Sequence, residues 1–385
     1  MTEDNPRQVL RSRFLAARAE TDALFGTVRP EAMYDRPIPE RHRIVFYIGH
    51  LEAFDRNLLS DAGTGQSEFD RLFAFGIDPV GGDLPTDGPL DWPRLEIVNE
   101  YRDRTRREVD RLLMSVDDEQ RMNVAIEHRL MHAETLAYIF HQMPFERKMG
   151  ARDAALSRRE SKTESIYIPA GQATLGSRRD SATFGWDNEF EQLTVHVPEF
   201  KVDKGKITNG QFRRFLEEGG YNDRSLWTDS DWEWRSAQEI SHPVFWVRRG
   251  DAWNYRSMFE EVPLPVGEPV FVSHAEASAY TRWAGKVLPT EAQWHRAAQP
   301  GCGIEGLIAT GWEWTSTEFA PFPGFQPMPF YPGYSEPFFD GKHYVLKGGS
   351  HRTAPAMLRP SFRNWFQPHY QYVYAGFRCA ERGEH

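Results

Sequence analysis

Two histidines four residues apart are the part of the sequence most suited to holding a metal ion. They are His128 and His132, in the segment Glu127–Thr135, which has the composition of a helix. Residues at positions i and i+4 lie one turn apart on the same helical face, so both imidazoles can reach one ion. With 13 histidines in 385 residues, chance alone gives roughly 0.4 such pairs. The pair therefore needs a third ligand before it indicates a metal site.

A third histidine, His50, lies among apolar residues in another segment that we expect to be helical. A lone buried histidine is more often bonded to a backbone carbonyl than to a metal. Three imidazoles from two helices, however, are a normal way to build a metal site inside a bundle. They suit Fe(II), Zn(II), Cu(II) or Ni(II), and the ligands alone do not choose. Glu134 lies about 200° around the helix from His132, so we expect a supporting or surface carboxylate there, not a ligand.

The elements that must position these histidines form the first 150 residues. Apolar residues recur there at three- and four-residue spacings in four segments, which predicts a four-helix bundle. The fourth helix is expected to start with Ser115 as its N-cap, to contain His128 and His132, and to end before Pro144. The other three are predicted at Arg7–Phe25, Glu40–Leu59 and Pro93–Met114.

The rest of the chain has a different pattern of apolar and polar residues. A charged, Ser/Arg-rich stretch predicts a linker, which we place at residues 151–163 between domains at 1–150 and 164–385. Beyond it, short apolar pieces alternate with Gly, Pro and Asp, and 11 of the 12 tryptophans occur there. Only Asn209–Glu217 and His274–Trp283 have clear helical periodicity. We therefore expect a loop-rich α+β domain held together by buried aromatic side chains.

The composition favours some classes of protein over others. The formal net charge is −10, whereas a general nucleic-acid binder needs a basic surface. No apolar run approaches the length of a membrane span, and the polar start has no signal-peptide pattern. The two cysteines, Cys302 and Cys379, cannot form a disulfide framework or a thiolate zinc site. We expect a soluble cytoplasmic protein that binds small molecules, with no nucleic-acid or membrane partner.

The order of elements resembles that of the ergothioneine-biosynthesis sulfoxide synthases. These are non-heme iron enzymes in which a DinB-like four-helix bundle precedes a formylglycine-generating-enzyme-like domain with a C-type-lectin-like α+β fold. In the bundle, Gly49-His50-Leu51 and His128-x-x-x-His132-x-Glu134 resemble the ligand motifs of the family. The similar segments of the second domain are Ile168–Gly171, Phe184–Glu189, Ile207–Asn209, Leu288–Trp294, Trp312–Ser316, Gly348–Ser350, Phe362–Trp365 and Gly376–Arg378.

This resemblance implies an Fe(II) enzyme that uses O2. The sulfur of cysteine, or of a cysteine-containing thiol such as γ-glutamylcysteine, would be joined to imidazole C2 of hercynine (N-α-trimethylhistidine) and oxidised to a sulfoxide. Aromatic rings suit the trimethylammonium group, because it is a cation that donates no hydrogen bond. By similarity, Asn364 and Trp365 would contact hercynine. A tyrosine would donate a proton near the iron, and the resemblance leaves Tyr331, Tyr334 and Tyr101 as the possible donors.

Two positions depart from the better-studied members of the family. Met131 stands where they carry Gln directly before the second helical histidine, and Phe366 stands where some carry Asp to hold the amino group of γ-glutamylcysteine. Both changes favour the branch that uses free cysteine. Basic residues of the third helix would then bind the substrate carboxylate, and the possible ones are Arg94, Arg102 and Arg104.

Other functions fit parts of the pattern. A selenoneine synthase or a 5-histidylcysteine sulfoxide synthase would share fold and metal. A DinB-type thiol transferase would use zinc or nickel and need no O2, and a binding module would not be an enzyme at all. Formylglycine-generating activity itself rests on two cysteines late in the domain, and the sequence has none between Gly349 and Asn364.

Overall fold

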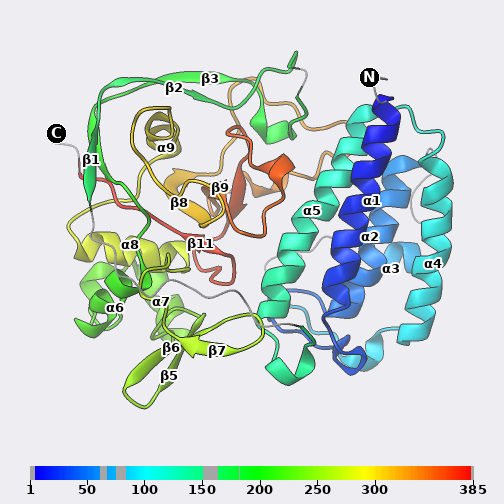
Figure 1. The fold of residues 1–385 in the computed structure, drawn as a ribbon, viewed down its shortest axis with the longest axis horizontal. Helices are drawn as coiled ribbons and strands as arrows, with labels where there is room; N and C mark the ends of the chain where they lie inside the picture. The colour runs from blue at the N-terminus through cyan, green and yellow to red at the C-terminus, as the bar shows by residue number, and fades with distance from the viewer. Residues whose placement is uncertain (1–4, 61–66, 75–83, 151–163, 182, 383–385) are drawn as a thin grey trace. The chain divides into compact units, whose positions relative to one another are not determined.

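The computed structural model of the chain describes residues 5–60, 67–74, 84–150, 164–181 and 183–382. Two compact units make up the chain, Met1–Arg152 and Asp153–His385. The first is built from helices and the second combines short helices with strands (Figure 1), as an α+β class requires. The linker predicted at 151–163 lies outside the described residues. In the part of the chain that is described, no helix is both long and apolar enough to cross a membrane.

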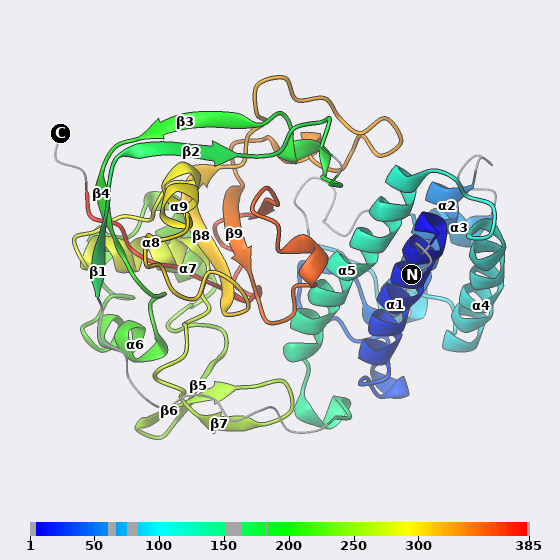
Figure 2. The same ribbon diagram turned by 45° about the horizontal axis from the view of Figure 1, so that its top comes forward.

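The first unit is the predicted four-helix bundle. Its long helices run alongside one another in both views (Figures 1 and 2), with α1 packed on α5, and α2 packed on both α4 and α5. A five-residue helix, α3, is inserted between α2 and α4. The bounds are Pro6–Phe25 for α1, Ile44–Leu59 for α2, Glu68–Leu72 for α3, Leu95–Leu112 for α4 and Glu119–His141 for α5.

One predicted helix start was wrong. The N-cap of α5 is Asp118, whose carboxylate accepts the backbone N–H of Arg121 at 3.0 Å. Ser115 lies in a turn that continues α4, and its hydroxyl donates to the carbonyl of Leu112 at 3.2 Å. Both residues are good caps, but Ser115 is already used by the preceding helix.

A buried ionic cluster joins the helices that carry the histidines. Arg129 of α5 is fully buried, and its guanidinium donates to Asp55 and contacts Glu52 at 2.9 Å, both on α2. The ring of Phe14 from α1 lies 5.4 Å from the same guanidinium. Burial raises the pKa of Asp55 to about 7, although the charge of Arg129 opposes the shift. The guanidinium of Arg129, the residue after His128 on α5, thus contacts side chains of both α1 and α2.

Replacing Arg129 by Ala should destabilise the bundle strongly. The change leaves Asp55 buried without the cation that pairs with it, which typically costs about 3–5 kcal/mol. Glu52 loses one of its two cations and keeps its ion pair with Arg106. Urea unfolding followed by far-ultraviolet circular dichroism measures the loss. Arg7→Ala is the control, because its ion pair with Asp117 is exposed and worth about 1 kcal/mol or less. Equal stability of the two variants would mean that the buried cluster does not hold the bundle together.

The second unit is organised around a four-stranded sheet with the order β10–β9–β8–β11. Neighbouring strands of this sheet are antiparallel, except that β11 is parallel to β8. In Figure 2, α9 lies between the ribbon of β2 and β3 and the strands β8 and β9. The sheet strands are β8 (Gly311–Glu318), β9 (Tyr344–Gly349), β10 (Asn364–Phe366) and β11 (Ala375–Gly376).

Smaller strand pairs and short helices surround this sheet. The strands are β1 (Ser165–Ile168), β2 (Gly171–Leu175), β3 (Leu193–Val197), β4 (Phe200–Asp203), β5 (Trp246–Arg249), β6 (Ala252–Arg256) and β7 (Glu261–Pro263). Both predicted helices are present, as α6 (Asn209–Glu217) and α8 (His274–Trp283). Two more helices were not predicted, α7 (Asp229–Ala237) and α9 (Glu291–Ala297), and each has a threonine N-cap.

A buried ion pair fixes the strand that carries the predicted substrate contacts. Arg363 directly precedes β10, and its guanidinium makes two hydrogen bonds to the carboxylate of Glu291 on α9, at 3.0 and 3.1 Å. Both side chains are buried. Paired hydrogen bonds of this kind restrict the direction of a side chain as well as its distance. The backbone at Arg363 is therefore held in place directly before Asn364, the first residue of β10.

Candidate metal centre

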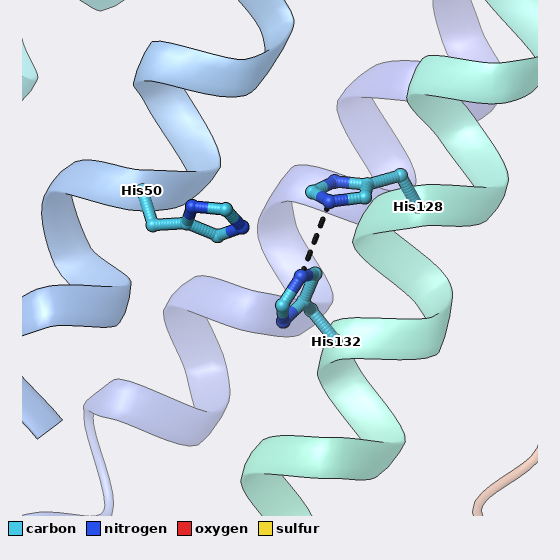
Figure 3. A group of neighbouring side chains, drawn as sticks. All are labelled: His50, His128 and His132. Carbon is cyan, nitrogen blue, oxygen red and sulfur yellow. Dashed lines mark hydrogen bonds between the residues drawn. The ribbon is translucent and has the colours of Figure 1, made fainter. Parts of the chain in front are cut away.

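The three predicted ligands come together inside the bundle. His50 extends from α2 and His128 and His132 from α5, and the three rings face a common space (Figure 3). One ring nitrogen of each lies within 4.8 Å of those of the other two. The Nε2 atoms of His128 and His132 are 3.1 Å apart. In the described part of the chain, no other cluster of His, Cys, Asp or Glu meets the same criterion for a metal site.

All three imidazoles are neutral at physiological pH. Burial lowers the pKa of His50 to about 4, although the backbone of Phe73 opposes the shift. Burial also lowers the pKa values of His128 and His132 well below the ordinary value, helped by the neighbouring histidines. A neutral imidazole keeps a nitrogen lone pair, which a metal requires. The site therefore has three uncharged nitrogen donors that need not lose a proton first.

The arrangement of these donors fits a single ion. Two nitrogens bound at right angles to one ion, each at about 2.1 Å, are about 3 Å apart. The Nε2 atoms of His128 and His132 have this spacing. Without a metal, one of these nitrogens must carry hydrogen, since two facing lone pairs repel each other. Once that hydrogen has moved to Nδ1 of the same ring, a metal ion would satisfy both Nε2 lone pairs and that of His50 at once.

Aromatic rings and one carbonyl orient the ligands. The ring of Phe54 stacks on His128, with centroids 3.4 Å apart, and Phe46 stacks on His50 at 4.9 Å. Nδ1 of His50 donates to the carbonyl of Phe73 at 2.8 Å. Because a carbonyl can only accept, Nδ1 carries the hydrogen and Nε2 keeps its lone pair. None of these three aromatic residues was predicted to be part of the site.

The other site residues predicted in the bundle differ in their burial and in their contacts. Glu134 is buried on α5, so the surface position that we allowed for it is wrong, and it is not a member of the three-histidine group. Met131 is half-buried on the same helix. Tyr101 is buried on α4, and its hydroxyl donates to Asp70 at 2.9 Å. Arg104 is exposed, with its guanidinium 5.6 Å from the ring of Tyr101.

Two cavities in the bundle unit include arginines that we predicted as carboxylate partners. Arg94 lines a cavity of about 810 Å³ together with Arg36, Arg43 and Trp92. Arg36 and Arg43 are both paired with Asp87, so Arg94 is the arginine of this cavity with no ion pair among the described residues. A smaller cavity of about 400 Å³ includes Arg102.

In the second unit, three of the predicted residues lie in one aromatic cluster. The ring of Trp365 stacks on Phe319 with centroids 4.2 Å apart and is 5.3 Å from Tyr334. Tyr334 is buried against Trp186 at 3.9 Å. Tyr331 is half-buried, 5.7 Å from Tyr334. Sequence segments almost 180 residues apart thus form one surface around Trp365.

The neighbours of Trp365 on β10 point to the opposite face of the sheet, since side chains alternate along a strand. Phe366 is paired in register with Tyr344, and its ring stacks on Tyr370 at 5.1 Å. The side-chain oxygen of Asn364 accepts the backbone N–H of Trp365 at 2.9 Å. All three residues of β10 are half-buried, so each keeps surface that a ligand can contact. Their part in the reaction remains a prediction.

Comparison with protein families agrees with this architecture. The chain matches the DinB superfamily over residues 13–145. It matches the sulfatase-modifying factor enzyme 1-like domain over residues 151–306 and 299–383. The chain is therefore a two-part protein, in which a DinB helical bundle with a three-histidine cluster precedes a domain of the sulfatase-modifying-factor type.

Curated relatives narrow this class. Hercynine oxygenase of Mycolicibacterium thermoresistibile is 32% identical over 306 residues, covering 67% of this chain and 68% of the relative. Hercynine oxygenase of Mycobacterium tuberculosis is 36% identical over 238 residues, covering 50% and 55%. Ergothioneine biosynthesis protein 1 of Schizosaccharomyces pombe is 28% identical over 427 residues, covering 91% and 53%. The chain belongs to the hercynine oxygenase family, and its matches span about half to two thirds of these relatives' lengths.

Replacing any one histidine of the cluster should abolish tight binding of a single divalent metal. Loss of a residue that merely supports a ligand costs about 10- to 100-fold in affinity, so His50→Asn and His128→Asn should each cost more than about 100-fold. Titration of the metal-free protein with Fe(II) under anaerobic conditions measures this. His141→Gln is the matched control, because His141 is also buried on α5 but lies outside the cluster. Full iron occupancy in His50→Asn would remove His50 from the ligand set.

Proposed function

We propose that the protein is a non-heme Fe(II) sulfoxide synthase that joins a thiol to hercynine in ergothioneine biosynthesis. The observation that carries the proposal is the cluster of three neutral histidines between α2 and α5. It occurs in a chain whose relatives are named hercynine oxygenase. Three nitrogen donors leave open positions on a six-coordinate ion, which suits Fe(II) that reacts with O2.

The reaction is balanced with one molecule of each substrate. The thiol R–SH, the C2–H of the hercynine imidazole and O2 give the sulfoxide R–S(=O)–C2 and one H2O. A C–S bond forms while S–H and C–H bonds are broken. Forming this bond and oxidising the sulfur release two electrons each, and these four electrons reduce O2 to the sulfoxide oxygen and water. When bound, Fe(II) would supply redox chemistry with O2 and positions that bring both substrates together.

The protein's own residues would hold, orient and shield the reactants. The histidines hold the metal in an interior lined by Phe46 and Phe54, which restricts water and fixes the rings. Holding two substrates and O2 in register is a large part of such catalysis, because it replaces collisions in solution. The cluster of Trp365, Phe319 and Tyr334 has the chemistry to receive a trimethylammonium group, since aromatic faces attract cations. Tyr331 and Tyr334 stay possible proton donors.

For the thiol, we propose free cysteine. Neither the side chain of Met131 nor that of Phe366 can form a hydrogen bond or an ion pair with the polar groups of a γ-glutamyl extension. The ring of Phe366 packs on Tyr370 instead. Arg94 supplies an exposed guanidinium beside a cavity, which suits a carboxylate partner.

Fe(II)-loaded protein should consume O2 only when hercynine and a thiol are both present. The product should have the combined mass of the two substrates less two hydrogens plus one oxygen, measured by mass spectrometry. Proton NMR should show that the C5–H of the imidazole remains and the C2–H is lost. Cysteine, γ-glutamylcysteine and a selenosugar should be compared as donors. A product formed without O2 would point to a thiol transferase, and no O2 uptake with any of the three donors would contradict the proposal.

Phe366→Asp should shift the preference towards γ-glutamylcysteine. A carboxylate at this position can pair with the amino group of the γ-glutamyl part, and about 1.4 kcal/mol of added interaction raises the ratio of kcat/KM values about tenfold. Steady-state O2 uptake with each thiol measures this ratio. Phe366→Asn is the matched control, because it has the same shape without the charge. If both variants change the ratio equally, position 366 does not select the thiol.

A further inference from the structure

The ligand His50 differs from the other two in how its ring is held. Its Nδ1 donates to the Phe73 carbonyl, whereas the Nδ1 atoms of His128 and His132 are buried with no hydrogen-bond partner among the described residues. A hydrogen bond at the outer nitrogen fixes both the tautomer and the direction of a ligating ring. The position of one backbone carbonyl therefore decides whether Nε2 of His50 faces the other ligands.

Phe73 is held against α2 by a glycine. Its ring is completely buried, and a Cβ built on Gly49 would lie 2.5 Å from the ring atoms. Such a distance is impossible for real atoms, so only glycine at position 49 lets the ring approach this closely. The residue immediately before the ligand His50 thus provides the space for the residue that bonds it.

Phe73 is the C-cap of the short helix α3, and Asp70 of this helix contacts two long helices. This carboxylate is buried and accepts the hydroxyl of Tyr101 on α4 at 2.9 Å. It also forms an ion pair of 2.8 Å with Arg56 on α2 and closes the capping box with Ser67 at the start of α3. The ring of Tyr101 lies 5.3 Å from that of Phe73. A five-residue helix is too short to be stable alone, so these contacts hold it in place.

We infer that Tyr101 is a positioning residue of the metal centre. Through Asp70 it holds α3, α3 presents the carbonyl of Phe73, and that carbonyl keeps Nδ1 of His50 protonated with Nε2 directed at the metal. The inference rests on the proposed function and deepens it, because it gives Tyr101 a role other than proton donor. A positioning residue changes metal binding when it is altered, whereas a proton donor changes turnover only.

The test is Tyr101→Phe, which removes the hydroxyl and keeps the ring. We expect affinity for Co(II), followed by its visible absorption as a substitute for Fe(II), to fall about 10- to 100-fold. The electron paramagnetic resonance spectrum of the iron–nitrosyl form should also change. Gly49→Ala, which displaces Phe73, should have the same effects. Tyr138→Phe is the control, since Tyr138 is another buried tyrosine of the bundle. Thermal unfolding checks that each variant folds.

The outcomes separate the inference from the proposed function. Normal Co(II) affinity and an unchanged nitrosyl spectrum in Tyr101→Phe, with lower turnover, would overturn the inference and leave the function standing. If the unaltered protein bound no metal, the function would fail. The inference would then be tested in the metal-free protein by 15N NMR of labelled histidine, with His50→Asn used to assign the signal. Loss of the Nδ1-protonated form of His50 in Tyr101→Phe would support it, and an unchanged tautomer would overturn it.

Discussion

The structure of the first unit depends on keeping three uncharged imidazoles in its interior between two helices. Burying a ring nitrogen without a partner is unfavourable, because an unpaired polar atom inside a protein costs about 1–3 kcal/mol. Nε2 of His128 and Nε2 of His132 bond each other at 3.1 Å. Within the described residues, His50 alone of the three has its outer nitrogen, Nδ1, bonded to the protein. A bound metal would satisfy the inner nitrogens of all three. In the proposed function, the bound ion thus supplies a common partner that the described part of the bundle lacks for these inner nitrogens.

The helix α2 connects this centre to the rest of the bundle on two sides. Glu52 and Asp55 bind the buried guanidinium of Arg129 from α5. Arg56 binds Asp70 of α3. The contacts of Arg129 fix the spacing between α2 and α5, and so the spacing between His50 and the other two histidines. The contact between Arg56 and Asp70 fixes α3 against α2. Charges elsewhere in the bundle therefore contribute to the geometry of a site that itself contains uncharged nitrogens.

The sequence could bring the three histidines together because they obey local rules, and their role as metal ligands stays a prediction. The four-residue spacing of His128 and His132 places them on one face of a helix, and the bundle follows from apolar periodicity. The carbonyl of Phe73 could not be predicted, since every residue has a carbonyl and this one is 23 positions from His50. The N-cap of α5 was misplaced because Ser115 and Asp118 both suit a cap. The aromatic cluster of Trp365 depends on contacts across the second unit that no local pattern indicates.

We propose that His50, His128 and His132 bind one Fe(II). Anomalous diffraction at the iron absorption edge, from crystals grown without oxygen in the presence of Fe(II), tests it most directly. We expect one peak, about 2.1 Å from a ring nitrogen of each histidine, with Nδ1 of His50 still bonded to the carbonyl of Phe73. A peak elsewhere, or one that His50 does not contact, would contradict the claim.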